Sequence, residues 1–286
     1  MSTESEVYAQ PIFVTNVSEC YFYHTTELPD LGVQVGEWDL RGKFEEYVGS
    51  ISFAGKRVFD VGCGSGFLSF SAENRGAREV ISFDMDDSKR QHWLPFHQKL
   101  HYTAPAEFQA QHNKCIERWR NAYWLTHRLT NSRAKMIYGD VYDITLAVGK
   151  FDIVMVCSIL EHLADPIRAL ASIARIAASE LVITTPVIET EDKIARFEGD
   201  AGRPEIDYVW WTYSIGIYNH VLNMLGFDIV SITKGRYKFV LTDSLEERTT
   251  IVARRYQGGQ SYRCPTTQYR SSPFRWLRPI RRYFRR

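Results

Sequence analysis

The chain of 286 residues lacks the features expected of a membrane or secreted protein. It contains no run of about 18 apolar residues, the length that a membrane-spanning helix requires. Residues 1–20 have no basic start followed by an apolar stretch, so we expect no secretory signal. The five cysteines are scattered and none forms a Cys-x-x-Cys pair, which indicates reduced thiols. We therefore expect a cytoplasmic protein.

Acidic residues and lysines are absent after Glu247, whereas eleven arginines follow it. The preceding 247 residues hold 24 of the 35 basic residues and all 34 acidic ones, a net charge of −10. Such a body repels a phosphate backbone, so we do not expect its catalytic part to bind nucleic acid. The basic end would attract RNA or an anionic membrane instead.

The segment 273–286 interleaves arginines with aromatic and aliphatic residues, namely Phe274, Trp276, Leu277, Ile280, Tyr283 and Phe284. This combination favours the interface of an anionic lipid surface, so we expect peripheral binding at the inner face of the membrane. The alternatives are RNA docking, pairing with the acidic body, and a merely solubilising tail.

A short apolar strand, residues 56–61, leads into a turn with three alternating glycines, Gly62, Gly64 and Gly66. Glycine permits positive φ and a close approach of ligand to backbone, so the turn predicts a nucleotide-type site. The third glycine of a dinucleotide fingerprint is missing, because Phe67 stands in its place. A phosphate loop is excluded as well, since no Lys-Ser/Thr pair follows.

Strands and helices alternate over residues 54–186, which predicts a parallel sheet covered on both faces. An acid stands at the end of each of the next two predicted strands. Asp84 ends the first of them, 24 residues after Asp60, and Asp140 follows the second. Spacing favours a helix over 39–48, a helix over 111–129 and a helix over 214–225 that Gly226 ends. The segments 227–233 and 249–254 are predicted to be the last, antiparallel strands.

The pattern Asp60-x-Gly62-x-Gly64-x-Gly66 resembles motif I of the class I S-adenosylmethionine-dependent methyltransferases. This resemblance implies an α/β, Rossmann-like fold with a mostly parallel seven-stranded sheet, helices on both faces and an antiparallel edge strand. It also implies S-adenosyl-L-methionine as the cofactor. Residues 51–257 would form this domain, after an N-terminal cap segment, 1–50, and before the Arg-rich tail, 258–286.

The same resemblance implies which residues hold the cofactor. Asp60 and the glycines would hold its methionine end, Asp84 its ribose and Asp140 its adenine amine. The full set is Asp60, Gly62, Gly64, Gly66, Asp84, Met85, Asp140, Val141 and Cys157.

Two narrower resemblances concern the acceptor. The Glu161-His162-Leu163 and Asp165-Pro166 segments resemble the quinone-biosynthesis methyltransferases. The order of the elements over residues 20–255 resembles that of the tRNA wobble-uridine carboxymethyltransferase-like enzymes. In the tRNA enzymes basic residues grip RNA, whereas the body of this chain is acidic.

His162 is the candidate general base, because it follows a strand end where open parallel sheets place their ligands. The alternative is a structural role in capping or packing. The candidate acceptor wall consists of Tyr23, His24, Trp38, Tyr208, Trp210 and Trp211. Aromatic faces suit the apolar face of a sugar, although such residues also fill cores.

The segment 88–110 exceeds what a strand-to-strand crossover needs and is a candidate lid, or else a surface excursion. His97 and His101 have the spacing of two ligands on one helical face, but no Glu completes a metalloprotease-like motif, so we expect no metal.

The function expected from these features is methyl transfer to a hydroxyl of a sugar, in a glycan precursor or a related small metabolite of polysaccharide biosynthesis. The alternatives are an RNA methyltransferase that docks through its tail and a non-catalytic protein that binds S-adenosylmethionine.

Overall fold

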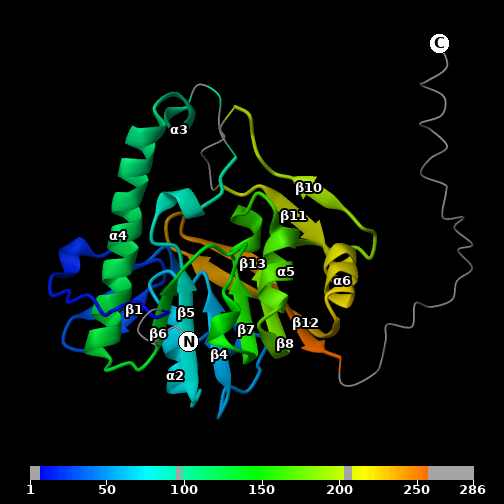
Figure 1. Cartoon of the computed structure of the whole chain (residues 1–286), viewed down its shortest axis with the longest axis horizontal. Coiled ribbons are helices and arrows are strands. Elements are labelled where there is room, and N and C mark those ends of the chain that lie inside the picture. The colour runs from blue at the N-terminus through cyan, green and yellow to red at the C-terminus, as the bar shows by residue number, and fades with distance from the viewer. Residues whose placement is uncertain (1–6, 95–96, 98, 203–207, 257–286) are drawn as a thin grey trace, which may run out of the picture. The chain divides into compact units, whose positions relative to one another are not determined.

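An eight-stranded sheet carries the fold in the computed structural model (Figure 1). Its strand order is β3-β12-β13-β8-β7-β4-β5-β6. Five neighbouring strands are parallel, with bounds β4 (Arg57–Val61), β5 (Glu79–Asp84), β6 (Lys135–Tyr138), β7 (Phe151–Cys157) and β8 (Ala177–Thr185). Three are antiparallel to their neighbours, with bounds β12 (Phe227–Phe239), β13 (Ser244–Arg255) and β3 (Trp38–Asp39).

The structure describes residues 7–94, 97, 99–202 and 208–256. The chain divides into a compact unit, Met1–Arg255, and a second unit, Tyr256–Arg286, and the predicted tail segment 258–286 lies outside the described residues. Within the described residues, no helix is long and apolar enough to cross a membrane.

The mostly parallel, Rossmann-like sheet predicted for the class I methyltransferases is confirmed, with one strand more than expected. The extra strand is β3, which pairs with the tip of β12 through Trp38 and Asp39. The helix predicted over 39–48 is therefore shorter, α1 (Phe44–Tyr47). Asp39 belongs to β3, and Gly42 turns the chain at a φ of +70° before the helix begins.

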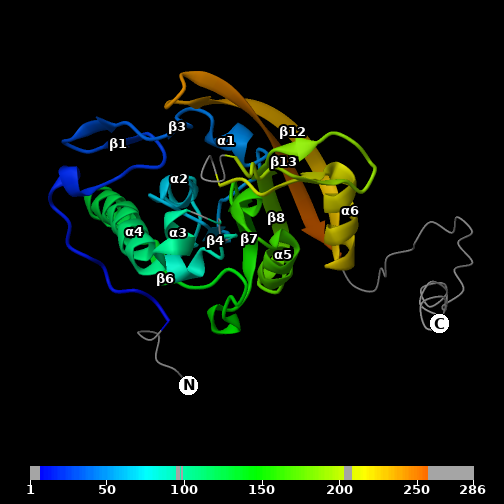
Figure 2. The same ribbon diagram turned by 90° about the horizontal axis from the view of Figure 1, so that it is seen from above.

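Helices cover both faces of the sheet (Figure 2). One face packs against α5 (Pro166–Ala174) and α6 (Ile215–Met224), and the other against α1, α2 (Phe67–Asn74) and α4 (Pro105–Leu129). Successive residues of a strand point to opposite faces, so Val58 joins one core and Phe59 the other. The buried strands therefore read as continuous apolar runs, which is why they were visible in the sequence.

The long helix α4 begins at Pro105, six residues before the predicted start. Pro105 occupies the first helical turn, where the missing N–H costs nothing. The rest of the predicted lid contains a single 3-10 turn, η3 (Ser88–Arg90), and a one-turn helix, α3 (Leu100–Thr103).

The smaller elements lie around the sheet. β1 (Thr26–Leu28) and β2 (Gly32–Gln34) form an antiparallel hairpin in the N-terminal cap segment. β9 (Val187–Ile188), β10 (Ala195–Phe197) and β11 (Trp211–Ser214) form a three-stranded sheet. Short 3-10 turns complete the set, namely η2 (Val17–Glu19), η4 (Leu146–Val148) and η5 (Leu160–His162).

Candidate active site

The glycine turn after β4 has the backbone that only glycine adopts readily. Gly62, Gly64 and Gly66 have φ values of +74°, +55° and +89°. There is also no room for a side chain at Gly62, because its Cβ would lie 2.3 Å from a methyl carbon of Ile159. Gly66 then starts α2, and a Cβ there would collide with Phe70 and Tyr123. Gly62 and Gly64 line a cavity, whereas Gly66 packs inward.

Asp60 lies beneath this turn and is almost completely buried, with 1% of its surface exposed. A chain of hydroxyls reaches its Oδ2: Ser69 donates to Asp60 at 2.7 Å, Ser82 to Ser69 at 2.7 Å, and Tyr123 to Ser82 at 2.9 Å. Burial raises the pKa of Asp60 to about 7. Its Oδ1 has no hydrogen-bond partner among the described residues, and Asp60 is not among the residues that line the cavity.

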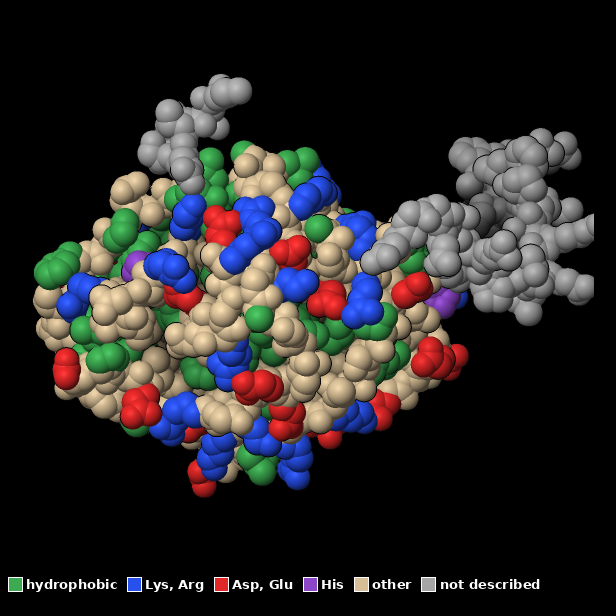
Figure 3. Space-filling model, turned by 90° about the horizontal axis from the view of Figure 1, so that it is seen from below, with side chains coloured by type: hydrophobic (Ala, Val, Ile, Leu, Met, Phe, Trp, Pro, Cys, Tyr) green, Lys and Arg blue, Asp and Glu red, His purple; other side chains and the backbone are tan. Residues whose placement is uncertain are grey.

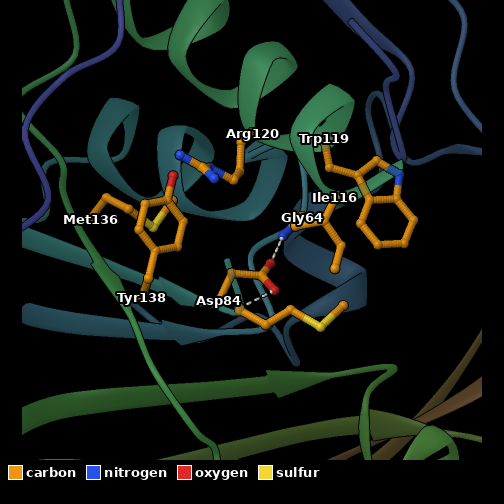
Figure 4. A pocket seen from close by; sticks show the side chains of 8 residues that line it. Gly64, Asp84, Ile116, Trp119, Arg120, Met136 and Tyr138 are labelled. Atoms are coloured by element: carbon orange, nitrogen blue, oxygen red, sulfur yellow. Dashed lines mark hydrogen bonds between the residues drawn. The ribbon is translucent and has the colours of Figure 1, made fainter. Parts of the chain in front are cut away.

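Asp84 ends β5 and lines the cavity. Figure 4 shows its carboxylate in a smaller pocket that Gly64, Ile116 and Trp119 also line. Its Oδ2 accepts the N–H of Gly64 at 2.7 Å and its Oδ1 the N–H of Met85 at 2.8 Å. Burial raises its pKa above the usual range, although these two N–H groups counteract that effect. Oδ2 also accepts the Cys63 thiol at 3.8 Å, so of the four or so lone-pair sites of the carboxylate one on Oδ1 is left for a donor from a ligand.

Asp140 follows β6 and is held by the segment that precedes α3. His92 Nε2 lies 2.8 Å from Asp140 Oδ2, and the N–H of Tyr142 is donated to Oδ1 at 2.8 Å. The next residue, Val141, is buried and lines the cavity. The sequence did not reveal the partnership of His92 with Asp140, because 48 residues separate them.

The cavity has a volume of about 1010 Å³ and lies at the carboxyl ends of four adjacent parallel strands. This is where the strand order reverses between β4 and β7, the position at which open α/β sheets bind ligands. The residues at these strand ends that line it are Gly62, Gly64, Asp84, Met85, Gly139, Val141 and Cys157. The volume lies at the upper end of what small-ligand sites have, so it can hold more than one small molecule.

His162 ends η5 and lines the same cavity. Its Nδ1 lies 3.1 Å from the backbone oxygen of Tyr208. A carbonyl oxygen only accepts, so Nδ1 carries the proton and Nε2 is the unprotonated nitrogen of the neutral ring. Nε2 can therefore accept a proton, which is the property that a general base needs.

The N-terminal cap segment closes the cavity on another side. Ser65 Oγ, in the glycine turn, accepts the backbone N–H groups of Tyr23 at 3.2 Å and of His24 at 3.4 Å. Both side chains line the cavity. Burial lowers the pKa of His24 to about 3, so this ring stays neutral, and its Nδ1 has no hydrogen-bond partner among the described residues.

Two of the remaining acceptor candidates line the cavity and two do not. Trp38 lines it, with its ring tilted by 43° against that of Phe239 at 4.8 Å between centroids, and Tyr208 lines it as well. Trp211 packs against the core and donates its indole N–H to the oxygen of Ala164 at 3.2 Å, and Trp210 is buried. Neither of the two is among the lining residues; Trp211 is the first residue of β11 and Trp210 precedes it.

Arg248 is a lining residue that the sequence did not single out. It was counted with the basic residues after Glu247, but it belongs to β13 and its guanidinium carbon lies 4.6 Å from the centre of the Trp38 ring. Alternation along the strand was the available signal, because Glu246, two residues before Arg248, points to the same side and lines the cavity too.

The histidines considered as metal ligands lie in aromatic surroundings. The His97 ring is 5.4 Å from Tyr102, and the His101 ring is 5.0 Å from Phe108. Within the described ranges, no three His, Cys, Asp or Glu side chains are grouped so that they could hold a metal ion.

Residues 39–232 match the family model described as a methyltransferase domain, which is more than half of the chain. The chain belongs to the methyltransferase domain family. The prediction made from motif I is thereby confirmed, and S-adenosylmethionine is the cofactor of this methyltransferase.

Curated relatives carry two kinds of name. The chain is 27% identical to a tRNA U34 carboxymethyltransferase of Pseudomonas putida strain GB-1, over 79% of this chain and 61% of that protein. It is 30% identical to a ubiquinone biosynthesis O-methyltransferase of Aromatoleum aromaticum, over 43% of this chain and 40% of that protein. The methyltransferase thus spans less than two thirds of the length of either relative.

Solved structures resemble it at low identity. The magnesium protoporphyrin IX methyltransferase of Synechocystis, with bound S-adenosylhomocysteine, is 16% identical, covers 76% of this chain and 82% of that one, and has a TM-score of 0.49. A SAM-dependent methyltransferase of Methanosarcina mazei is 13% identical, with 74% and 95% covered and a TM-score of 0.49.

The residues present fit S-adenosylmethionine. The cofactor carries no phosphate, and the strand ends that line the cavity offer an acid and close backbone rather than lysine. Asp84 provides free acceptor capacity for ribose hydroxyls, and Val141 an apolar surface. Asp60 underlies the turn, so its predicted direct contact with the methionine end remains a prediction.

Proposed function

We propose that this methyltransferase methylates a hydroxyl of a sugar, in a glycan precursor or a related small metabolite. The observation that carries the proposal is the contact of His162 with the Tyr208 carbonyl in the wall of the cavity. The His162 Nδ1–H is engaged by the Tyr208 carbonyl at 3.1 Å, and its Nε2 is left as a base in the wall of the cofactor cavity.

The division of work follows from this arrangement. Bound S-adenosylmethionine supplies a methyl group on a positively charged sulfur, an electrophile that needs no further activation. Asp84 and the glycine turn would hold the cofactor, and the cavity walls would hold the acceptor beside it. His162 Nε2 would accept the hydroxyl proton as the acceptor oxygen takes the methyl group; the bond from that methyl carbon to sulfur would break and leave a neutral thioether, and the ring would become an imidazolium.

The lining of the cavity supports a sugar acceptor. Aromatic side chains, among them Tyr23, Trp38 and Tyr208, offer faces for the apolar side of a pyranose. Three carboxylates, Glu37, Glu161 and Glu246, also line the cavity and can accept hydrogen bonds from hydroxyls.

A transfer assay with radiolabelled methyl donor and fractions of cell lysate tests the proposal. Label should enter a carbohydrate or small-metabolite fraction, and His162→Ala should lower turnover by about 10²-fold while the affinity for S-adenosylhomocysteine stays nearly unchanged. Lowered affinity with an undiminished single-turnover rate would make His162 structural.

A second candidate is RNA methylation, which the relatives named tRNA U34 carboxymethyltransferases favour. The acids in the cavity wall and the acidic body oppose it. On the face shown in Figure 3, basic and acidic side chains are intermixed rather than gathered into one basic surface. If label enters the RNA fraction of the same assay, RNA and not a sugar is the acceptor. If label enters no fraction, a non-catalytic protein is favoured.

A further inference from the structure

Trp93 is the centre of a stack of rings beside the candidate base. Its indole lies 4.4 Å from the Tyr208 ring with an interplanar angle of 8°, so the two rings are parallel. The His112 ring, from α4, contacts the indole at 4.4 Å as well. The indole is therefore fixed by α4, and Tyr208 is fixed by the indole.

Tyr208 needs such support. Its φ is +45°, a conformation that a bulky residue adopts only when its surroundings impose it. The carbonyl of the same residue accepts the Nδ1–H of His162 at 3.1 Å. The backbone that determines the His162 tautomer is thus held by a ring-to-ring contact with Trp93.

Trp93 is also tied to the cofactor end of the cavity through its neighbour. His92 has a φ of +54° and places its Nε2 2.8 Å from Asp140 Oδ2. Two consecutive residues of the segment 88–94 therefore contact Asp140, the predicted adenine acceptor, and Tyr208, the residue that orients the candidate base.

We infer that Trp93 is a positioning residue of this methyltransferase. Its stacking on Tyr208 keeps the Tyr208 carbonyl against His162 Nδ1 and so keeps Nε2 unprotonated and directed to the acceptor. Trp93 acts on the reaction through Tyr208 and His162. The inference rests on the proposed role of His162, and it gives the segment predicted as a lid a defined task.

Nitrogen NMR of the full-length protein with ¹⁵N-labelled histidine tests the inference without any turnover. The His162 signals are assigned from their loss in His162→Gln. We expect protonated Nδ1 and unprotonated Nε2 in the wild type and a mixture of the two tautomers in Trp93→Ala. Trp93→Phe retains a ring to stack and should restore the wild-type pattern, although it lacks the indole N–H.

Trp119→Ala is the matched control, because Trp119 is another tryptophan that lines the cavity, and its ring lies 6.4 Å from that of His112. It should leave the His162 tautomer unchanged. Tyr208→Ala should give the same mixture of His162 tautomers as Trp93→Ala. The double variant should give no larger change than either single variant, because each substitution removes the same ring-to-ring contact.

Single-turnover kinetics are a second test of the inference. Trp93→Ala should lower the single-turnover rate by up to roughly tenfold, the range that one stacked aromatic pair can supply. The Kd of S-adenosylhomocysteine, measured by calorimetry, should stay within about twofold, since Asp84 and the glycine turn, the proposed cofactor-binding residues, are unchanged.

An unchanged His162 tautomer in a folded Trp93→Ala variant would overturn the inference. It would also be overturned if Trp93→Ala weakened the binding of S-adenosylhomocysteine by the same factor as it slowed methyl transfer, since Trp93 would then belong to the cofactor site. Failure of the proposed function is a separate result. Full turnover in His162→Ala would show that His162 is not the general base, whereas the His162 tautomer could still depend on Trp93.

Discussion

At the scale of single residues, the two acids near the glycine turn that were predicted to hold the cofactor lie in different surroundings. Asp84 lines the cavity, whereas Asp60 is 1% exposed and accepts a hydrogen bond from Ser69 of α2. The sequence shows both acids near strand ends, but it does not show which side chain reaches the cavity.

Asp84→Ala should weaken the binding of S-adenosylhomocysteine by about 2 kcal/mol, because ribose hydroxyls lose a charged acceptor. The loss includes a looser turn, since Gly64 and Met85 lose the acceptor of their N–H groups. Calorimetry measures the change, and Asp143→Ala, an exposed acid, is the control. Undiminished affinity in Asp84→Ala would contradict the assignment.

Asp60 should make the free energy of unfolding depend on pH. Its pKa is raised from 3.8 to about 7 in the fold, so the folded state holds a proton that the unfolded state releases. The stability that this group contributes is complete below about pH 4 and is lost as the pH rises through about 7, at about 1.4 kcal/mol per unit.

The test is Asp60→Asn, which keeps an acceptor for Ser69 and does not titrate. Denaturant unfolding at pH 5 and pH 8 should show a smaller loss of stability for this variant than for the wild type. Parallel pH dependences of the two proteins would show that Asp60 does not titrate in this range.

At the scale of elements, the active site is assembled from segments that are far apart in the chain. The parallel strands supply the cofactor side, while the cap segment, α4 and the β12–β13 hairpin supply the other walls. Within the cap segment, the backbone at Gly36 packs closely against that of residues 24–25. A Cβ on Gly36 would lie 2.4 Å from the backbone carbonyl carbon of His24 and 2.6 Å from the backbone nitrogen of Thr25.

Gly36→Ala should therefore displace the cap and cost about 2–4 kcal/mol of stability, because backbone atoms cannot yield cheaply. Gly32→Ala is the matched control in the same cap, since its Cβ meets nothing within 4 Å and only its φ of +66° is strained, at about 1 kcal/mol. Denaturant unfolding compares them, and equal losses would mean that the cap can shift freely.

At the scale of the whole molecule, the charge is divided unequally between the two parts of the chain. We propose that the Arg-rich tail, 258–286, brings the methyltransferase to an anionic membrane surface and so to a lipid-linked glycan. Each arginine near such a surface contributes about 1 kcal/mol.

Co-sedimentation with vesicles tests this proposal. The full-length protein should pellet with vesicles rich in anionic lipid at low salt, whereas a version that ends at Gly258 should stay in solution and keep its affinity for S-adenosylhomocysteine. Neutral vesicles are the control. If both versions stay in the supernatant, the membrane proposal is wrong, and RNA binding with a steep salt dependence would take its place.

The sequence by itself determined the fold class, the glycine turn and the positions of Asp84 and Asp140. These are local features: buried parallel strands are continuous apolar runs, and a turn at positive φ requires glycine. Each can be recognised in a window of about ten residues, so no distant contact is needed.

Only the tertiary structure decided which of the candidates meet. It brought Tyr23, His24 and Trp38 to the cavity, turned Trp210 and Trp211 into the fold, and paired His92 with Asp140. It also joined Trp93, Tyr208 and His162, which are separated by up to 115 residues. Such contacts depend on the closure of long loops and on the direction of each side chain, and local sequence encodes neither.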